Sequence, residues 1–214
     1  MVAENISVLK QEIGRNVSLV IVSKYRTIDE INAAYATGHR VFAENRVQAL
    51  MERKAALPDD IQWHLIGHLQ TNKVKQVVPF VSMIQSVDSV KLLNEINEQA
   101  AKYNRVIDCL LQVHIAMEET KLGFSKEELL ALIKSNTLGK FTHVKFRGLM
   151  GMATNTNDQG QVEREFKSLS SLFNEIKPEF GSEFNVLSMG MSSDYKLAIA
   201  CGSNMVRVGS AVFG

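Results

Sequence analysis

The chain has 214 residues, of which 45% are hydrophobic and 22% are charged, and its formal net charge is +1. This balance argues against a nucleic-acid-binding protein, which carries a strong basic excess, and the two isolated cysteines, Cys109 and Cys201, indicate buried free thiols rather than a zinc site. No apolar stretch approaches the ~18–20 residues of a membrane span, and no signal peptide is apparent, so we expect a soluble cytoplasmic protein without metal.

Short apolar runs alternate along the chain with segments of helical periodicity. Residues 27–30 and 125–128 fit capping boxes, in which a hydroxyl and a carboxylate satisfy free N–H groups at a helix start. Segments 89–103 and 159–177 carry the apolar stripe of a helix that packs on a core. We predict strands at the apolar runs, which lie at residues 19–23, 40–43, 62–66, 83–86, 106–114, 144–149, 184–188 and 205–208.

This alternation predicts a single α/β domain over residues 1–214, folded as a closed (β/α)8 TIM barrel. Strands that alternate with helices pair in parallel through right-handed crossovers, and eight such units favour a closed barrel over an open sheet. After the eighth strand and its loop only AVFG remains, which we expect to be too short for a helix. The N-terminal segment 2–13 is then the helix that covers the remaining gap in the outer ring.

Candidate functional residues fall where the predicted strands end, because the βα loops of such barrels carry the chemistry. The stretch LVIVSKYRT at residues 19–27 leads a buried strand into Lys24. A lysine there is either a solvated turn residue or an amine placed for a carbonyl compound. Asn45, His64 and Met150 lie at the ends of other strands. Taken alone, His64 and Met150 are interpreted as core residues.

Two stretches near the end of the chain predict an anion site. SMGMSSD at residues 188–194 precedes a predicted helix at 193–201, for which Ser192 or Ser193 is the expected N-cap, and RVGS at residues 207–210 ends the last strand. Glycines let the backbone approach an anion, hydroxyls donate to it, and a helix N-terminus adds a favourable dipole. Because closure makes the first and last strands neighbours, these loops and Lys24 describe a pocket for a phosphorylated aldehyde held as an imine.

At these residues the chain closely resembles the pyridoxal phosphate homeostasis protein family, single-barrel relatives of the alanine racemase N-terminal domain. The matching stretches are VSKYRT, FAENRVQAL, WHLIGHLQTNK, SVDS, EETKLGF, RGLMGM, LSMGMSSDYKLAI and VRVGSAVFG. The resemblance implies that pyridoxal 5'-phosphate (PLP) is the cofactor and forms a Schiff base with Lys24. It also implies further PLP-binding residues: Asn45, His64 and Met150 along the ring, Arg207 facing the pyridine nitrogen, and Ser188, Met189, Gly190, Ser192, Gly209 and Ser210 in the phosphate-binding stretches.

The sequence departs from the family pattern at two positions. Ala43 stands where glycine is common, and Arg46 stands where an aromatic residue is common. The first departure is expected to shift the turn at Asn45 slightly, and the second to alter the rim of the pocket. Neither position belongs to the amine or to the phosphate-binding stretches.

The resemblance favours a PLP carrier in intracellular PLP homeostasis over an enzyme with regular turnover. A guanidinium stays charged and has no acceptor, so Arg207 cannot hold a proton on the pyridine nitrogen, and an unprotonated ring is a poor electron sink. In related racemases a second acid–base group comes from a β-rich domain, for which we see no residues here. We expect a monomer, with apo PLP-dependent enzymes as candidate recipients.

Two enzymatic alternatives stay open. One is a small PLP-dependent amino-acid racemase or lyase, with Tyr25, Glu118 or Lys121 as the second base. The other is an imine-forming aldolase that uses Lys24 on a sugar phosphate. Glu119 and Lys121 follow the fifth predicted strand. They form either a loop ion pair or a helix-start carboxylate, or else a site that admits or passes on PLP.

Overall fold

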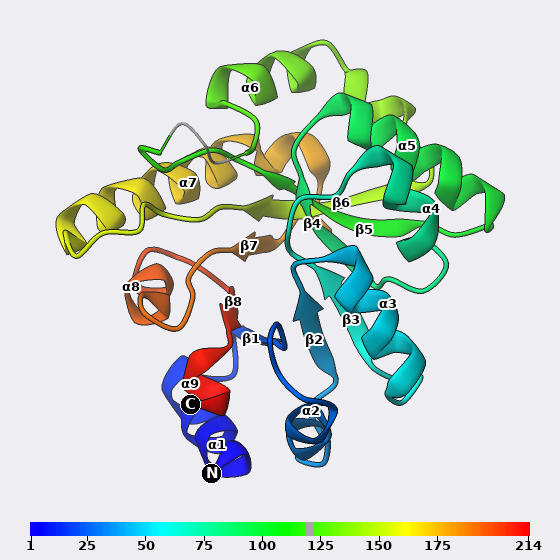
Figure 1. Ribbon diagram of the computed structural model, residues 1–214. Coiled ribbons are helices and arrows are strands. Elements are labelled where there is room, and N and C mark those ends of the chain that lie inside the picture. The colour runs from blue at the N-terminus through cyan, green and yellow to red at the C-terminus, as the bar shows by residue number, and fades with distance from the viewer. Residues whose placement is uncertain (119–121) are drawn as a thin grey trace.

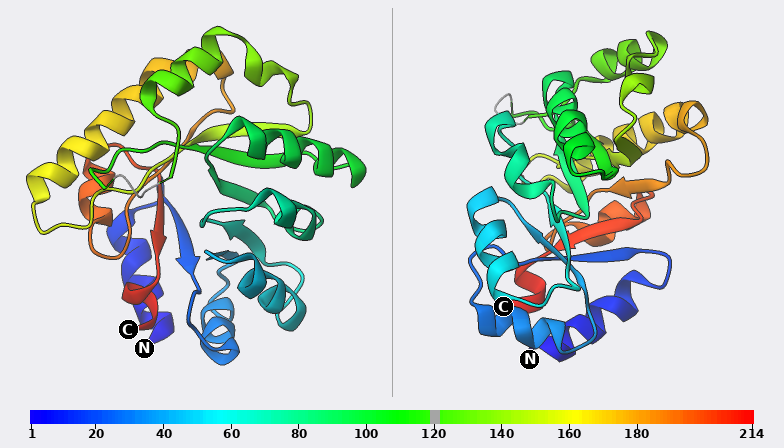
Figure 2. Two further views of the ribbon diagram at one scale, coloured as in Figure 1. Left: turned by 45° about the horizontal axis from the view of Figure 1, so that its top comes forward. Right: turned by 90° about the vertical axis from the view of Figure 1, so that its right-hand side faces the viewer.

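The computed structural model describes residues 1–118 and 122–214 (Figures 1 and 2). Within these residues the strands form a closed, parallel barrel in chain order, and the last strand pairs with the first, Ile21 opposite Val208. The predicted (β/α)8 fold is therefore confirmed. The strands are β1 (Ser18–Val22), β2 (Val41–Glu44), β3 (Gln62–Leu65), β4 (Met83–Val87), β5 (Ile107–Gln112), β6 (Val144–Met150), β7 (Val186–Ser188) and β8 (Met205–Val208).

Two strands are shorter than their apolar runs predict by two or more residues. β5 ends at Gln112, and Val113 makes only an isolated bridge to Phe124. β7 begins at Val186, because Phe184 belongs to a turn in which its N–H donates to the Gly181 carbonyl at 3.2 Å. The Phe184 ring is fully buried beside the aromatic rings of the preceding helix. A run of apolar residues therefore indicates burial and does not by itself predict strand pairing.

The helices surround the barrel (Figure 1). Both predicted capping boxes are present, at Thr27 and Ser125. α3 and α4 begin without a side-chain cap, and neither is marked by a start signal in the sequence. The helix predicted to end at residue 177 continues through Pro178. The bounds are α1 (Val2–Ile13), α2 (Ile28–Tyr35), α3 (Val47–Ala56), α4 (Val74–Val77), α5 (Val90–Lys102), α6 (Lys126–Lys134), α7 (Gln159–Phe180), α8 (Tyr195–Ala200) and α9 (Ser210–Phe213).

The N-terminal helix α1 closes the outer ring at the seam between β8 and β1. Its Asn5 side chain donates to the Val212 carbonyl at 2.9 Å, and its Glu12 accepts from Lys196 of α8 at 3.2 Å. Figures 1 and 2 show the two chain ends side by side in every view. This confirms the covering role predicted for residues 2–13. The expectation that the last residues are too short for a helix is wrong, because packing beneath α1 stabilises the single turn of α9, where Val212 and Phe213 are buried.

The core has two layers. Between the strands and the helices lies a large apolar layer that includes Phe42, Trp63 and Phe166. Inside the barrel lies a small apolar cluster, and polar side chains occupy much of the remaining space. The members of the inner cluster are Val20, Ala43, Met83, Leu110, Met150 and Met205.

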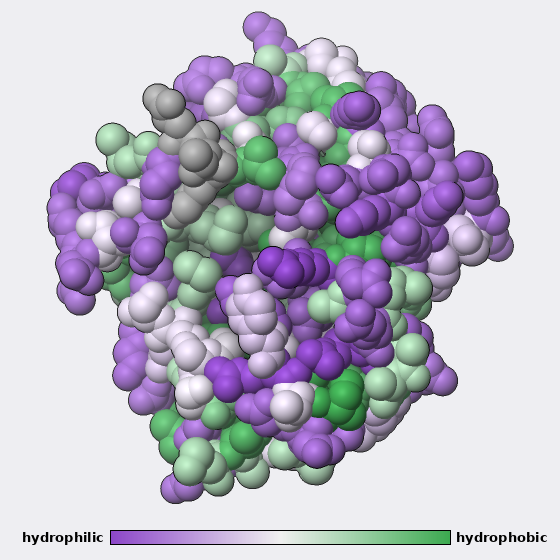
Figure 3. Space-filling model, viewed as in Figure 1, coloured by the Kyte–Doolittle hydropathy of each residue, from purple (hydrophilic) through white to green (hydrophobic). Residues whose placement is uncertain are grey.

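The outer surface is mainly polar. On the face shown in Figure 3, hydrophilic residues dominate and hydrophobic residues form small separate patches. Within the described part of the chain, no helix combines the length and apolar character required to cross a membrane.

Candidate functional site

Lys24 lies in the loop that leaves β1. The strand ends at Val22, and the Lys24 side chain two residues later is exposed. Between them Ser23 is fully buried, and its N–H donates to the Ala43 carbonyl of β2 at 3.0 Å. Among the described residues no carboxylate pairs with Lys24. The barrel therefore presents a free amine at the C-terminal end of its first strand.

The loop that carries Lys24 is held from behind by buried polar contacts. The Ser23 hydroxyl donates to Glu44 Oε1 at 2.7 Å, and Arg53 Nη2 of α3 donates to the Arg26 carbonyl at 2.5 Å. Arg53 Nε lies 3.7 Å from Glu44 Oε1. Burial raises the pKa of the Glu44 carboxyl, although the hydrogen bond from Ser23 and the charge of Arg53 act in the opposite direction. In this loop Tyr25 adopts a φ of 65° with an exposed ring.

The loops after β7 and β8 meet beside this amine. Ser192 Oγ accepts hydrogen bonds from the backbone N–H groups of Gly209 at 3.2 Å and Ala211 at 3.3 Å. A Cβ at position 209 would lie 3.1 Å from the Val22 carbonyl, so the β8 loop runs against the end of β1. Ser210 is exposed at the same loop. Two backbone donors thus converge on one oxygen, next to the strand that leads to Lys24.

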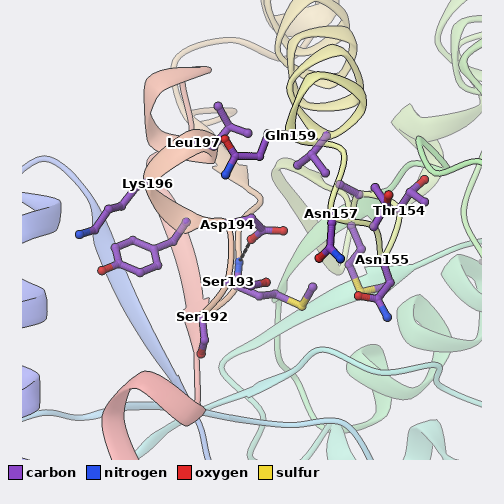
Figure 4. A pocket seen from close by; sticks show the side chains of 15 residues that line it. Thr154, Asn155, Asn157, Gln159, Ser192, Ser193, Asp194, Lys196 and Leu197 are labelled. Carbon is purple, nitrogen blue, oxygen red and sulfur yellow. Dashed lines mark hydrogen bonds between the residues drawn. The ribbon is translucent and has the colours of Figure 1, made fainter.

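The start of α8 differs from the prediction that Ser192 or Ser193 is its N-cap. The helix begins at Tyr195 after Asp194, whose Oδ1 accepts from the Met191 N–H at 2.6 Å (Figure 4). The Ser192 hydroxyl instead faces the β8 loop. Ser192 therefore connects the two loops rather than capping a helix.

Met189 and Gly190 are buried at the start of this loop. The Met189 side chain is fully buried in the helix-facing layer, and its N–H donates to the Met205 carbonyl at 3.2 Å. It has neither a donor nor an exposed side chain left for a phosphate. Gly190 has a φ of +96°, and a Cβ there would lie 2.6 Å from the Ala198 Cβ. Only glycine lets the loop pass so close to α8.

Arg207 is buried inside the barrel below the two loops. Its side chain is 3% exposed, with Nη1 donating to Ser188 Oγ at 2.7 Å and Nη2 donating to the Gly151 carbonyl at 2.9 Å. Among the described residues no carboxylate forms an ion pair with it. Burial lowers the pKa of Arg207 to about 10, so it remains charged at neutral pH. A buried cation without an acidic partner is costly for stability and indicates a functional role.

The Ser188 hydroxyl belongs to the barrel interior, not to the phosphate loop with which its sequence position groups it. It donates to Gln85 Oε1 at 2.7 Å, and Gln85 Nε2 lies 2.9 Å from His64 Nδ1. Burial lowers the pKa of His64 to about 4, so the ring is neutral at pH 7. Sequence reasoning missed Gln85, although a polar residue at an inward position of an apolar strand was a signal for it.

The other residues expected along the ring lie near these groups. Met150 is fully buried in the inner cluster with Ala43, whose methyl group the cluster accommodates. Asn45 is half-buried at the end of β2, and a Cβ at Gly67 would lie 2.0 Å from its carbonyl oxygen. Gly67 therefore allows the β3 loop to lie against Asn45. Arg46 is exposed at the start of α3, on the rim as expected.

Two pockets lie among the loops that follow the strands, and Lys24 lines neither of them. The larger, of about 890 Å³, lies between the β6 loop, including Thr154 and Asn155, and residues 191–197, which comprise the β7 loop and the first turn of α8 (Figure 4). The smaller, of about 270 Å³, extends from Asn45 along the start of α3. Ser192 belongs to the larger pocket and Asn45 to the smaller, so the predicted site residues border both.

The candidates for a second acid–base group are only partly described. Glu119 and Lys121 lie outside the described residues, and so does their predicted role in admitting or passing on a ligand. Glu118 Oε1 accepts from the Asn155 N–H at 3.0 Å. Tyr25 stands 80% exposed beside the amine.

The fold and these groups together define the barrel type found in alanine racemases. The model of the alanine racemase N-terminal domain family matches residues 1–214. Curated relatives named pyridoxal phosphate homeostasis protein include one from Pasteurella multocida, 36% identical over 92% of this chain and 86% of its own length. Another, from Helicobacter pylori, is 38% identical over 92% of this chain and 87% of its own length. The chain therefore belongs to the pyridoxal phosphate homeostasis protein family.

Solved structures give the same result. PipY of Synechococcus elongatus, solved with PLP bound, superposes with a TM-score of 0.90 at 33% identity, and each chain covers 100% of the other. An alanine racemase from Clostridium difficile gives a TM-score of 0.78 at 14% identity. All of this chain matches 55% of that racemase, a likeness that concerns the fold alone.

Proposed function

We propose that this protein binds PLP in intracellular PLP homeostasis and holds it as a Schiff base on Lys24 without regular catalytic turnover. The curated relatives carry the name pyridoxal phosphate homeostasis protein, and the solved PipY structure contains PLP. The observation that carries the proposal is an amine that no described carboxylate pairs with, at the end of β1, the strand against which the β8 loop lies with its two converging backbone donors.

The residues present fit PLP. The Lys24 amine suits the aldehyde, the N–H groups of Gly209 and Ala211 suit a phosphate oxygen in place of the Ser192 hydroxyl, and Arg207 is a donor suited to an unprotonated ring nitrogen. When bound, PLP supplies an electrophilic aldehyde and a ring that withdraws electrons. Asn45, His64 and Met150 complete the proposed wall around the ring.

The chemistry of the interior supports binding over turnover. Arg207 is a permanent cation that only donates, and the His64 ring is neutral near pH 7, with its Nδ1 already beside Gln85. Neither side chain takes a proton from a substrate at neutral pH, whereas racemisation needs strong acid–base groups on both faces of the substrate carbon. These two side chains are therefore suited to hold a ligand and not to accept a proton from it.

Borohydride reduction after incubation with PLP tests the attachment point. We expect peptide mass spectrometry to find a phosphopyridoxyl group on Lys24, and Lys24→Ala to lose both the label and the absorbance of bound PLP. Lys91→Ala removes an exposed lysine of α5 and should keep both. A label on another lysine, or no label at saturating PLP, would overturn the proposal. Loss of the PLP absorbance in Lys24→Ala also argues against the aldolase alternative, which needs no PLP.

Incubation of the PLP-loaded protein with L-amino acids in deuterated water tests for turnover. We expect no sustained exchange of the α-proton. Exchange at ordinary enzymatic rates would instead support a racemase or lyase.

Apo PLP-dependent enzymes are the proposed recipients, and the proposed oligomeric state is a monomer. Transfer assays and sedimentation measure these two properties directly.

A further inference from the structure

A chain of polar side chains crosses the interior of the barrel from β8 to β3. It runs from Arg207 through Ser188 of β7 and Gln85 of β4 to His64, with successive distances of 2.7, 2.7 and 2.9 Å. All four residues are at most 5% exposed. Buried polar groups of this kind are stable only when each donor meets an acceptor, so the direction of every hydrogen bond can be derived.

The direction is set at Arg207. A guanidinium has donors and no acceptor, so Ser188 Oγ must accept from it. The Ser188 proton then goes to Gln85 Oε1, which places the Gln85 amide nitrogen toward His64. The second amide proton of Gln85 faces Met205 Sδ at 3.4 Å. Turning the amide over would place its nitrogen against Ser188 Oγ, so that the Ser188 proton would lose its acceptor, and its oxygen against His64 Nδ1, which would then have to donate.

We infer that Gln85 is a positioning residue that holds His64 in the neutral tautomer with its proton on Nε2, and that Arg207 imposes this choice from the opposite wall. Because Gln85 Nε2 donates, His64 Nδ1 must accept, and a neutral imidazole then carries its proton on the other nitrogen. Among the described residues, His64 Nε2 has no hydrogen-bond partner. His64 thus offers the barrel one donor and no free acceptor.

This tautomer limits which ligands can bind. This part of the inference rests on the proposed function. Both His64 and Arg207 present only N–H groups, so a ligand atom that meets either of them has to be an acceptor. PLP with an unprotonated ring nitrogen and an ionised phenolic oxygen satisfies this condition. A ligand that is protonated at these atoms would leave donors facing donors, which costs affinity.

The tautomer can be measured without ligand by NMR of the protein labelled with ¹⁵N-histidine, with His64 assigned by its loss in His64→Asn. We expect the wild-type ring to be protonated on Nε2 at pH 7. Gln85→Glu replaces the donor with an acceptor of the same shape and should move the proton to Nδ1 or charge the ring. Ser188→Ala frees the amide to turn and should give a mixture of tautomers. Gln62→Glu adds the same charge at the exposed start of β3, the strand that carries His64, and should leave the tautomer unchanged.

A wild-type proton on Nδ1, or an unchanged tautomer in both Gln85→Glu and Ser188→Ala, would overturn the inference. If Gln85→Glu does not fold, Ser188→Ala decides the result alone. We also expect PLP affinity to fall at least about tenfold in Gln85→Glu, equivalent to ~1.4 kcal/mol, and unchanged affinity would contradict the ligand step. The NMR experiment contains no PLP, so its failure is distinct from failure to label Lys24.

Discussion

The two layers of the barrel core differ in kind. Between strands and helices, large side chains such as Phe42, Trp63 and Phe166 are fully buried in an almost wholly apolar environment. Inside the barrel, Gln85 and Arg207 occupy positions that hydrophobic side chains fill in a purely structural barrel. The outer layer supplies stability, since it buries most of the apolar surface.

The inner layer contributes less to stability than the outer layer does. Arg207, Ser188, Gln85 and His64 each make a hydrogen bond there, yet a buried hydrogen bond contributes only about 1 kcal/mol net, and Arg207 forms no salt bridge with a described residue. Replacing such a group with an apolar one often stabilises a protein. The comparison teaches that damage to the outer layer should unfold the protein, whereas damage to the inner wall should mainly change ligand binding.

Removing a large side chain from the outer layer should have the largest effect on stability. Phe166 of α7 is fully buried, and Phe166→Ala should lower the free energy of unfolding by about 3–5 kcal/mol. Urea denaturation measures this loss. Tyr103→Ala, at a 48% exposed ring, serves as control and should cost far less. A loss below about 1 kcal/mol for Phe166→Ala would contradict the structural role of this layer.

A methyl group at Gly67 should disturb the site through the backbone. Its Cβ would lie 2.0 Å from the Asn45 carbonyl oxygen, so the β2 and β3 loops must separate. We expect a loss of about 1–3 kcal/mol in unfolding free energy, with weaker PLP binding by the folded protein. Gly160→Ala, where only the ends of flexible side chains come near, should be neutral or slightly stabilising. Equal behaviour of the two variants would exclude a specific role for this close contact.

Replacement of Arg207 by Met separates stability from binding. The change removes a buried charge, which should stabilise the fold, and two hydrogen bonds, whose loss should destabilise it. The net change in unfolding free energy should therefore stay within about 2 kcal/mol. PLP affinity should nevertheless fall at least tenfold. Urea denaturation and PLP titration of the same sample compare the two quantities. If Arg207→Met severely destabilised the protein and left PLP binding intact, the inner layer would have a structural role and not a ligand-binding one.

Glu44 is a buried polar residue in the otherwise apolar layer between strands and helices. Its replacement should have the smallest effect on stability among these variants. Burial raises its pKa in the folded protein, so the folded state holds this proton more tightly than the unfolded state does. Proton binding by Glu44 therefore stabilises the folded state. This stabilisation is fully present below the ordinary carboxyl pKa of about 4.3 and is lost as pH rises through the raised pKa of the folded protein. Glu44→Gln lacks this pH dependence.

The difference in unfolding free energy between Glu44→Gln and wild type should consequently shift in favour of the variant as pH rises from 4 to 7. Urea denaturation at several pH values provides the measurement. Glu98→Gln, an exposed carboxyl of α5, is the matched control. A difference that does not change with pH would show that burial of Glu44 has no energetic consequence.

Local patterns in the sequence predict the strands, two helix starts and the closure of the barrel. Apolar runs mark the strands, the capping boxes at Thr27 and Ser125 mark two helix starts, and eight alternating units imply that the first strand meets the last. These signals are local, because periodicity and capping depend on residues a few positions apart. The placement of Lys24 beside the β8 loop followed from closure alone.

Only the tertiary structure decided what the polar residues do. Ser188 and Gln85 are 103 positions apart, and Ser192 meets Gly209 across two loops, so no local pattern could pair them. The same reason explains why the helical turn of α9 was not predicted, because it depends on packing against the distant α1. A side chain's surroundings in a closed barrel come from strands on the opposite wall, and those neighbours exist only once the chain has folded.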